Sequence, residues 1–220
     1  MLSEITQDNV LMALDDAIYA FRRTVKSSEP IKDITDLPNA FLVVHKQLPI
    51  IFQVLESMQK NLSNDQPTEE LKESYAAVSQ LAEICRKQAL YMQSIFNSVT
   101  SSNDNVSKLE RYRTVVLKSE DHVKIEAVVQ NLIEEAIKVA VAPLVEDDLI
   151  EQLKDCEAEI SEVEASLDLE EKSKGEMVMT NYGSGYQFLH KGKGHQNHCS
   201  GGWQFTGDNA TNNFPPMPAR

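Results

Sequence analysis

Three short, related phrases stand near the C-terminal end of the sequence, at residues 183–187, 192–196 and 201–204. Each phrase combines a pair of glycines, a ring-bearing side chain and a glutamine. Repetition at a short period indicates stacked units, because no unit of this length can bury a face alone. We therefore predict an interaction motif made of Gly183, Gly185, Tyr186, Gln187, Gly192, Gly194, His195, Gln196, Gly201, Gly202, Trp203 and Gln204.

The residue types in these phrases suit a cross-β stack of identical chains. Such a stack satisfies every backbone donor and acceptor, and ladders of amide side chains and stacked rings add to it. Glycine lets the chain turn between short strands because it reaches positive φ without penalty. Residues 175–220 carry three basic and two acidic side chains, so little charge repulsion opposes stacking. On composition alone the same segment also fits a solvated, disordered tail, which is compatible with assembly once it is seeded.

A cluster of metal-ligand types overlaps the second phrase and ends before the third. His190, His195, His198 and Cys199 lie within ten residues, and imidazole and thiolate are ligands that zinc prefers. Their spacing matches no common zinc module. We therefore predict no metal site and assign the histidines to the repeat.

Other patterns that carry catalysis are missing from the sequence. No G-x-S-x-G phrase marks an activated serine, and no G-x-x-x-x-G-K-[ST] phrase marks a phosphate-binding loop. His45 and His122 stand alone in segments of helical pattern, where a surface or satisfied histidine is the ordinary interpretation. We predict no catalytic residues, no cofactor and no enzyme activity.

The net charge restricts the partners. The chain has 220 residues, a formal charge of −13 and a sequence pI of about 4.8. This balance argues against nucleic acid, whose phosphates need a basic face, and against direct docking on an anionic membrane. No apolar run approaches the roughly 18 residues of a membrane span, so we expect membrane contact only after activation. Three scattered cysteines and the lack of a basic leader indicate reduced thiols in the cytoplasm.

The part of the chain before the tail has the pattern of an all-α helical bundle. Apolar residues recur there at steps of three and four, which is the period of a buried helix face. We predict helices at about 5–26, 37–60, 68–100, 108–116, 121–142 and 146–169. The periodicity of the fifth segment places Ile137 and Val141 inward, and Pro49 predicts a kink or a break in the second helix. Asp36 is the expected N-cap of that second helix.

These segments divide the chain into three parts. Residues 1–145 form the bundle, residues 146–174 an acidic helix or linker, and residues 175–220 a tail rich in glycine, asparagine and glutamine. The acidic helix has a narrow apolar seam with heptad-like spacing. The seam could pack on the bundle or pair with a partner helix. Its members are Leu149, Leu153, Cys156, Ile160, Val163 and Leu167.

Three phrases in the helical part resemble the SesA-type domain found at the N-terminus of fungal NACHT and related STAND receptors. The first begins at Asp36 and ends at Ile51, the second covers residues 85–99, and the third joins residues 110–113 to the stretch around Glu126. The resemblance covers roughly residues 5–145. It implies family-motif positions at Leu37, Pro38, Phe41, Leu48, Pro49, Phe96, Arg111, Tyr112 and Glu126.

The tail in turn is similar to the sigma-type amyloid signalling motif. In families with such motifs, a receptor carrying one copy seeds the same motif on a downstream protein. The two resemblances together imply a non-enzymatic effector of fungal programmed cell death or heterokaryon incompatibility, which self-assembles and whose partner is a NACHT/STAND receptor with a similar motif. The alternative is a helical adaptor or regulatory protein that binds a partner through its last helix and carries an incidental tail.

Overall fold

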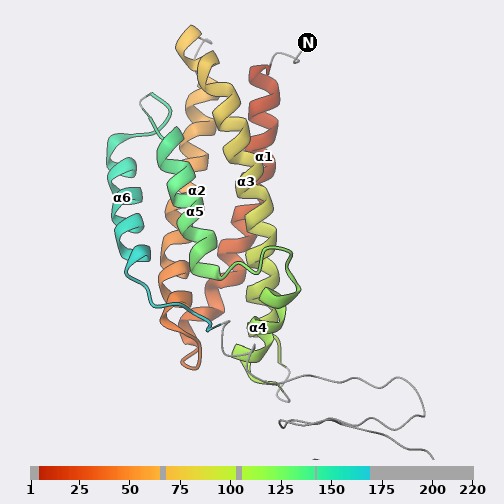
Figure 1. Ribbon diagram of the computed structural model, residues 1–220. Helices are drawn as coiled ribbons and strands as arrows, with labels where there is room; N and C mark the ends of the chain where they lie inside the picture. The colour runs from red at the N-terminus through yellow and green to blue at the C-terminus, as the bar shows by residue number, and fades with distance from the viewer. Residues whose placement is uncertain (1–4, 65–67, 103–105, 142, 169–220) are drawn as a thin grey trace, which may run out of the picture. The chain divides into compact units, whose positions relative to one another are not determined.

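The computed structural model describes residues 5–64, 68–102, 106–141 and 143–168 (Figure 1). All of them fall within one compact unit, which includes the last helix. The described residues contain helices and loops and no strand, as the sequence predicts for an all-α bundle. The elements are α1 (Gln7–Ser28), a 3-10 helix η1 (Glu29–Asp33), α2 (Asn39–Asn64), α3 (Glu69–Thr100), α4 (Lys108–Lys118), α5 (Ile125–Val139) and α6 (Asp147–Ser161).

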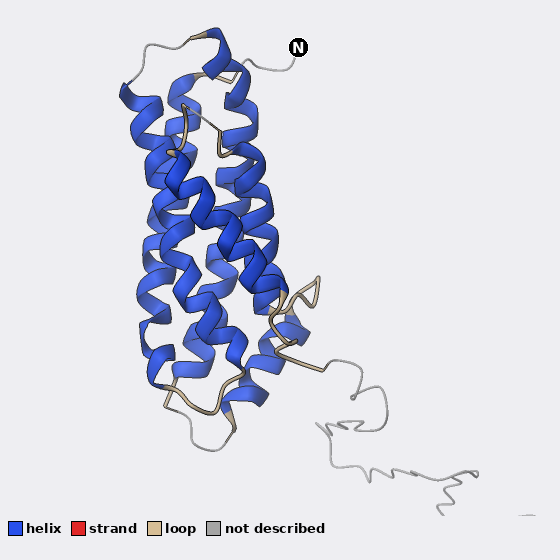
Figure 2. Ribbon diagram, turned by 90° about the vertical axis from the view of Figure 1, so that its left-hand side faces the viewer, coloured by secondary structure: helices blue, strands red, loops and turns tan. Residues whose placement is uncertain are grey.

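The three long helices α1, α2 and α3 lie side by side, and α1 packs against both of the others. Helix α5 lies over α2 and α3, while α4 contacts the end of α3. Helix α6 covers the outside of α2 and α5, and this side of the bundle faces the viewer in Figure 2. Burial of one apolar face per helix, at about 25 cal/mol per Å² of apolar surface, is the main stabilising term in such an arrangement.

The apolar periodicity correctly identified most of the buried faces. In α1, Val10, Leu14, Ile18 and Phe21 are buried. The helix begins at a capping box, in which the Thr6 hydroxyl accepts from the Asn9 N–H and the Asn9 side chain accepts from the Thr6 N–H. Such reciprocal bonds satisfy donors that the first turn cannot satisfy internally.

Helix α2 shows no break at Pro49, although the sequence predicts a kink or a break there. Proline in a helix interior removes one hydrogen bond and costs about 3 kcal/mol. The side chains on both sides of it, Leu48 and Ile51, are almost completely buried, so packing on the neighbouring helices offsets this cost. The expected N-cap role of Asp36 is also wrong. The helix begins only at Asn39, and the Asp36 carboxylate instead pairs with the Lys108 ammonium at 2.8 Å.

Two helices end earlier than the periodicity predicts. Helix α5 ends at Val139, so Val141 lies beyond it and is 50% exposed rather than inward. Helix α6 ends at Ser161, and residues 163–168 continue without helical structure. Of the seam residues within the helix, Leu153, Cys156 and Ile160 are buried and Leu149 is half-buried, where α6 contacts α2 and α5. Packing on the bundle, one of the two alternatives for this seam, is therefore confirmed.

Candidate functional site

Helix α4 places two adjacent residues of the third family phrase, Arg111 and Tyr112, against different parts of the bundle. The helix is fixed at its start, where the Ser107 hydroxyl accepts from the Glu110 N–H at 3.2 Å. The Arg111 guanidinium donates to the Ser101 carbonyl at 2.8 Å and to the Val99 carbonyl at 3.3 Å. A cation is favourable at the negative C-terminal end of a helix. Arg111 therefore joins the start of α4 to the end of α3.

The ring of Tyr112 packs on Phe41 from the first turn of α2. Their centroids are 4.9 Å apart and the ring planes meet at 83°, so the edge of one ring points at the face of the other. Both side chains are fully buried. Edge-to-face pairs of this kind add about 0.5–1.5 kcal/mol beyond their buried area. This contact connects the first and third family phrases.

The hydroxyl of Tyr112 lies at the centre of a chain of hydrogen bonds. It accepts from the backbone N–H of Ile125 at 2.9 Å, and its oxygen is 2.7 Å from the Ser166 hydroxyl. The Ser166 hydroxyl donates to one carboxylate oxygen of Glu126 at 2.6 Å, and the Ser166 backbone N–H donates to the other at 2.9 Å. Because Ser166 gives its hydroxyl proton to the carboxylate, Tyr112 is the donor to Ser166. We call Tyr112, Glu126 and Ser166 the Ser166 triad.

The electrostatics of the triad suit these roles. Burial raises the pKa of Tyr112 well above its ordinary value, so the phenol keeps the proton that it donates. Glu126 lies in the first turn of α5, where the positive end of the helix favours a carboxylate. Ile125 is the first residue of that helix, and Lys124 at the N-cap makes no side-chain capping bond. The Tyr112 hydroxyl therefore caps α5 from another helix.

The triad contains one residue that sequence reasoning missed. Ser166 stands between acidic residues in a stretch predicted to be helical, and no local pattern distinguishes it from an exposed serine. In the structure it lies beyond α6 and is only 5% exposed. It brings the segment after the last helix into contact with both parts of the third family phrase, around Tyr112 and around Glu126.

The other family-motif positions are spread over the bundle. Leu48 of α2 and Phe96 of α3 are fully buried core residues. Leu37, Pro38 and Pro49 are partly exposed. Of the nine predicted positions, the structure links Phe41, Tyr112 and Glu126 directly or through Ser166.

The predicted tail motif lies outside the described residues. This holds for all three phrases, at residues 183–187, 192–196 and 201–204, and for the candidate zinc ligands His190, His195, His198 and Cys199. Within the described residues, no group of three or more histidine, cysteine, aspartate or glutamate side chains could hold a metal ion.

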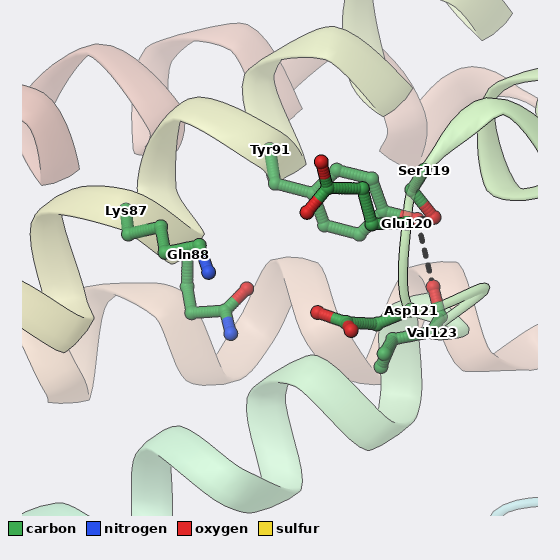
Figure 3. Close-up of a pocket in the computed structure, with 7 residues that line it drawn as sticks. All are labelled: Lys87, Gln88, Tyr91, Ser119, Glu120, Asp121 and Val123. Carbon is green, nitrogen blue, oxygen red and sulfur yellow. Dashed lines mark hydrogen bonds between the residues drawn. The ribbon is translucent and has the colours of Figure 1, made fainter.

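A small cavity lies between α3 and the loop that joins α4 to α5 (Figure 3). Its volume is about 140 Å³, and the Tyr91 ring from α3 forms part of its wall. The Tyr91 hydroxyl donates to the Val123 carbonyl at 2.8 Å and so fixes the loop to α3. The remaining lining residues are Lys87, Gln88, Ser119, Glu120 and Asp121. These side chains mix both signs of charge, which gives the cavity no evident preference for a ligand.

A second cavity of about 300 Å³ separates the start of α2 from the end of α6. Asn39 and Val43 line it from α2, and Glu159, Glu162 and Glu164 line it from the other side. The Glu159 carboxylate also accepts from the Gln47 amide at 3.1 Å, which ties α6 to α2.

Cys85, Cys156 and Ser28 are held in states that disfavour nucleophilic attack. Burial raises the pKa of Cys85 to about 12. Burial, together with the neighbouring Glu159 and Asp155, raises the pKa of Cys156 to about 11. The Ser28 hydroxyl lies 2.8 Å from Nδ1 of His45, but it donates its proton to the Val25 carbonyl. His45 is therefore the donor to Ser28, the reverse of a base that activates a serine.

The fold and the contacts of Tyr112 define an all-α domain in which the first and third family phrases meet where α2, α4 and α5 approach one another. Residues 15–138, more than half of the chain, match the SesA family, which is described as the N-terminal domain on NACHT-NTPase and P-loop NTPases. The chain belongs to the SesA family. Comparisons with curated proteins and with solved structures found no match.

The match confirms the resemblance drawn from the three phrases and fits a signalling role, since the domain accompanies NACHT-type NTPases. The resemblance of the tail to a sigma-type motif stays a prediction. Among the described helices, none has both the length and the apolar character that a membrane crossing requires.

Proposed function

We propose that this protein is a non-enzymatic signalling effector of fungal programmed cell death or heterokaryon incompatibility. A NACHT/STAND receptor with a similar motif would seed the tail, residues 175–220, into a cross-β stack. The helical domain would then be carried into the assembly as the output module. The protein would act in the cytoplasm, without a cofactor and without binding nucleic acid.

One combination of features carries this proposal: a SesA domain and a thrice-repeated glycine–ring–glutamine phrase in the same chain. The SesA family connects the chain to NACHT-type receptors. The repeat supplies amides and rings at a spacing that suits stacked strands. Neither feature needs an active site.

The distribution of charge supports different roles for the two parts of the chain: the tail assembles, and the helical domain keeps chains apart in solution. Residues 1–174 carry 32 acidic and 18 basic side chains, whereas residues 175–220 are almost neutral. Net charge of one sign keeps domains apart in solution. Stacking of the tails would hold these domains at a high effective concentration, which changes their encounters without any new contact surface.

The adaptor alternative loses its main support in the structure. It requires the apolar seam of the last helix to be available to a partner. Leu153, Cys156 and Ile160 are instead buried within the chain.

The order of the tail sequence provides the test. The full-length chain and a variant with residues 177–214 scrambled at fixed composition are purified and seeded with preformed fibrils of a synthetic 177–214 peptide. We expect the native chain to become thioflavin-positive and sedimentable, and the scrambled chain to stay soluble. Expression of both chains with a fluorescent label in a fungal host should give puncta and loss of viability for the native chain alone. Equal behaviour of the two chains in either assay, or a peptide that forms no fibrils, contradicts the proposal.

A further inference from the structure

The segment that follows α6 is attached to the bundle through Ser166 and Leu167. Residues 163–168 run from the end of α6 across the bundle toward the start of α4 and α5, seen as the blue stretch in Figure 1. Ser166 is held by its hydrogen bonds to Tyr112 and Glu126, and Leu167 is buried, with 3% of its surface exposed. Glu164, Ala165 and Asp168 are exposed. We call residues 163–168 the strap.

The position of the strap in the chain makes it separable. It comes after the six α-helices of the described residues, so its departure breaks none of these helices. The Phe41–Tyr112 pair and the bond from Ile125 to Tyr112 do not involve strap atoms. Segments with few buried apolar contacts open at a lower free energy than the whole domain. The strap therefore meets the conditions for local release from a folded bundle.

We propose that the strap is a releasable latch, closed by the Ser166 triad and by Leu167, which opens while the helices of the described residues stay folded. The proposal goes beyond the proposed function, because it concerns a described segment and holds whether or not the tail assembles.

The closed and open forms differ in defined contacts. Opening breaks three hydrogen bonds of Ser166, of which two go to a carboxylate, and exposes Leu167. It also frees six residues, which extend by about 20 Å at most, given roughly 3.3–3.6 Å per residue. The α2–α4 ring contact between Phe41 and Tyr112 persists in both forms.

Hydrogen exchange followed by mass spectrometry on the full chain tests the latch. In the native protein we expect peptides covering residues 163–168 to be protected at the Ser166 N–H, which donates to the Glu126 carboxylate. Ser166→Ala removes the hydroxyl from the triad, and Glu126→Gln removes a charged acceptor. Hydrogen bonds to charged groups contribute about 1.5–3 kcal/mol, so each variant should speed exchange in the strap by about ten- to a hundredfold. Peptides from α2 and α3 should exchange at the native rate.

Ser161→Ala is the matched control, because the Ser161 hydroxyl bonds only within the last turn of α6, to the Ala158 carbonyl. We expect native exchange in the strap of this variant. Cleavage by a glutamate-specific protease after Glu162 or Glu164 gives a second readout, and it should accelerate in parallel in the two triad variants. Three results overturn the proposal: unprotected strap amides in the native chain, unchanged exchange in both triad variants, or equal acceleration in α2 and the strap.

Discussion

The hydroxyl oxygens of Tyr112 and Ser166 lie 2.7 Å apart, although 54 positions separate the two residues in the chain. Tyr112 simultaneously caps the first residue of α5, so a single phenol organises the start of one helix and the path of the chain after another. Tyr112 belongs to a family phrase, whereas Ser166 lies beyond the matched residues 15–138. The family domain therefore makes a polar contact with a segment outside its matched range.

Removal of the Tyr112 hydroxyl should destabilise the whole bundle as well as the strap. Tyr112→Phe keeps the ring contact with Phe41 but leaves the buried N–H of Ile125 without its acceptor. A buried donor without a partner costs about 1–3 kcal/mol, so we expect the free energy of unfolding to fall by about this amount. The urea midpoint should fall accordingly, while the dependence of the unfolding free energy on urea concentration stays unchanged. Tyr19→Phe is the matched control, since Tyr19 is 64% exposed, and it should unfold as the native chain does. Equal midpoints for the three proteins would refute the capping role.

The fold could be predicted from the sequence to a large extent because helix faces follow a local period. Val10, Leu14 and Phe21 recur at steps that place them on one face, and the structure buries them. The first residue of α5 and the last residue of α6 could not be predicted in the same way. The start of α5 is capped by Tyr112 from another helix, and the chain after α6 is held by contacts with Tyr112 and Glu126. Such contacts depend on tertiary proximity, which no local pattern records.

The residues of the candidate site also divide into those that the sequence could predict and one that it could not. Tyr112 and Glu126 could be selected from the sequence because they belong to a family phrase. Ser166 could not, since a serine in an acidic, weakly periodic stretch has many ordinary roles. The prediction of a break at Pro49 had a different fault: it used the local cost of proline without the burial of the nearby Leu48 and Ile51.

Replacement of Arg111 should weaken the joint between α3 and α4. Arg111→Ala removes the guanidinium bonds to the Ser101 and Val99 carbonyls at the C-terminal end of α3. We expect a loss of about 1–3 kcal/mol, because charge-assisted bonds of a part-buried group are lost. Arg86→Ala removes a more exposed pair with Glu83, which solvent screens, and should have a smaller effect on stability. Thermal unfolding of both variants measures the difference, and equal losses would argue against the joint.

Pro49→Ala should stabilise the protein. The continuous helix at this position means that alanine restores a backbone donor without altering the buried face of α2. Relief of the proline penalty can contribute up to about 3 kcal/mol, so we expect a higher melting temperature and urea midpoint. Gln53→Ala, at an exposed position of the same helix, is the control and should have a small effect. A destabilised Pro49→Ala variant would mean that proline is required for the native path of α2.

Cys85 and Cys156 should resist alkylation while the bundle is folded. Burial raises their pKa values to about 12 and about 11, so at pH 8 almost no reactive thiolate is present. Iodoacetamide should modify both residues in urea and neither in buffer, as mass spectrometry of their peptides will show. Rapid modification in buffer would contradict this expectation.

The same shifts predict a loss of stability at high pH. A thiol whose pKa is raised on folding binds its proton more tightly in the folded state than in the unfolded state. Its contribution to the free energy of unfolding is therefore complete below about pH 9, the ordinary pKa of a thiol in an unfolded chain. This contribution is lost as the pH rises toward 11 for Cys156 and 12 for Cys85. Urea midpoints measured from pH 8 to pH 11 should fall, and Cys85→Ala should reduce the slope of that fall. An unchanged slope in the variant would assign the loss to other groups.

The tail glutamines provide a test that separates amide chemistry from mere composition. In a cross-β stack, identical side chains lie directly above one another at about 4.8 Å, so a carboxylate at such a position repels its own copies. Replacement of Gln187, Gln196 and Gln204 by glutamate should therefore prevent seeded assembly of the full chain at pH 7.5. Replacement of the same residues by asparagine keeps the amide ladder and should preserve assembly with altered kinetics. Acidification to about pH 4 neutralises many of the new carboxylates and should partly restore sedimentable material in the glutamate variant. If the glutamate variant assembles as readily as the native chain at neutral pH, the three glutamines do not stack in register.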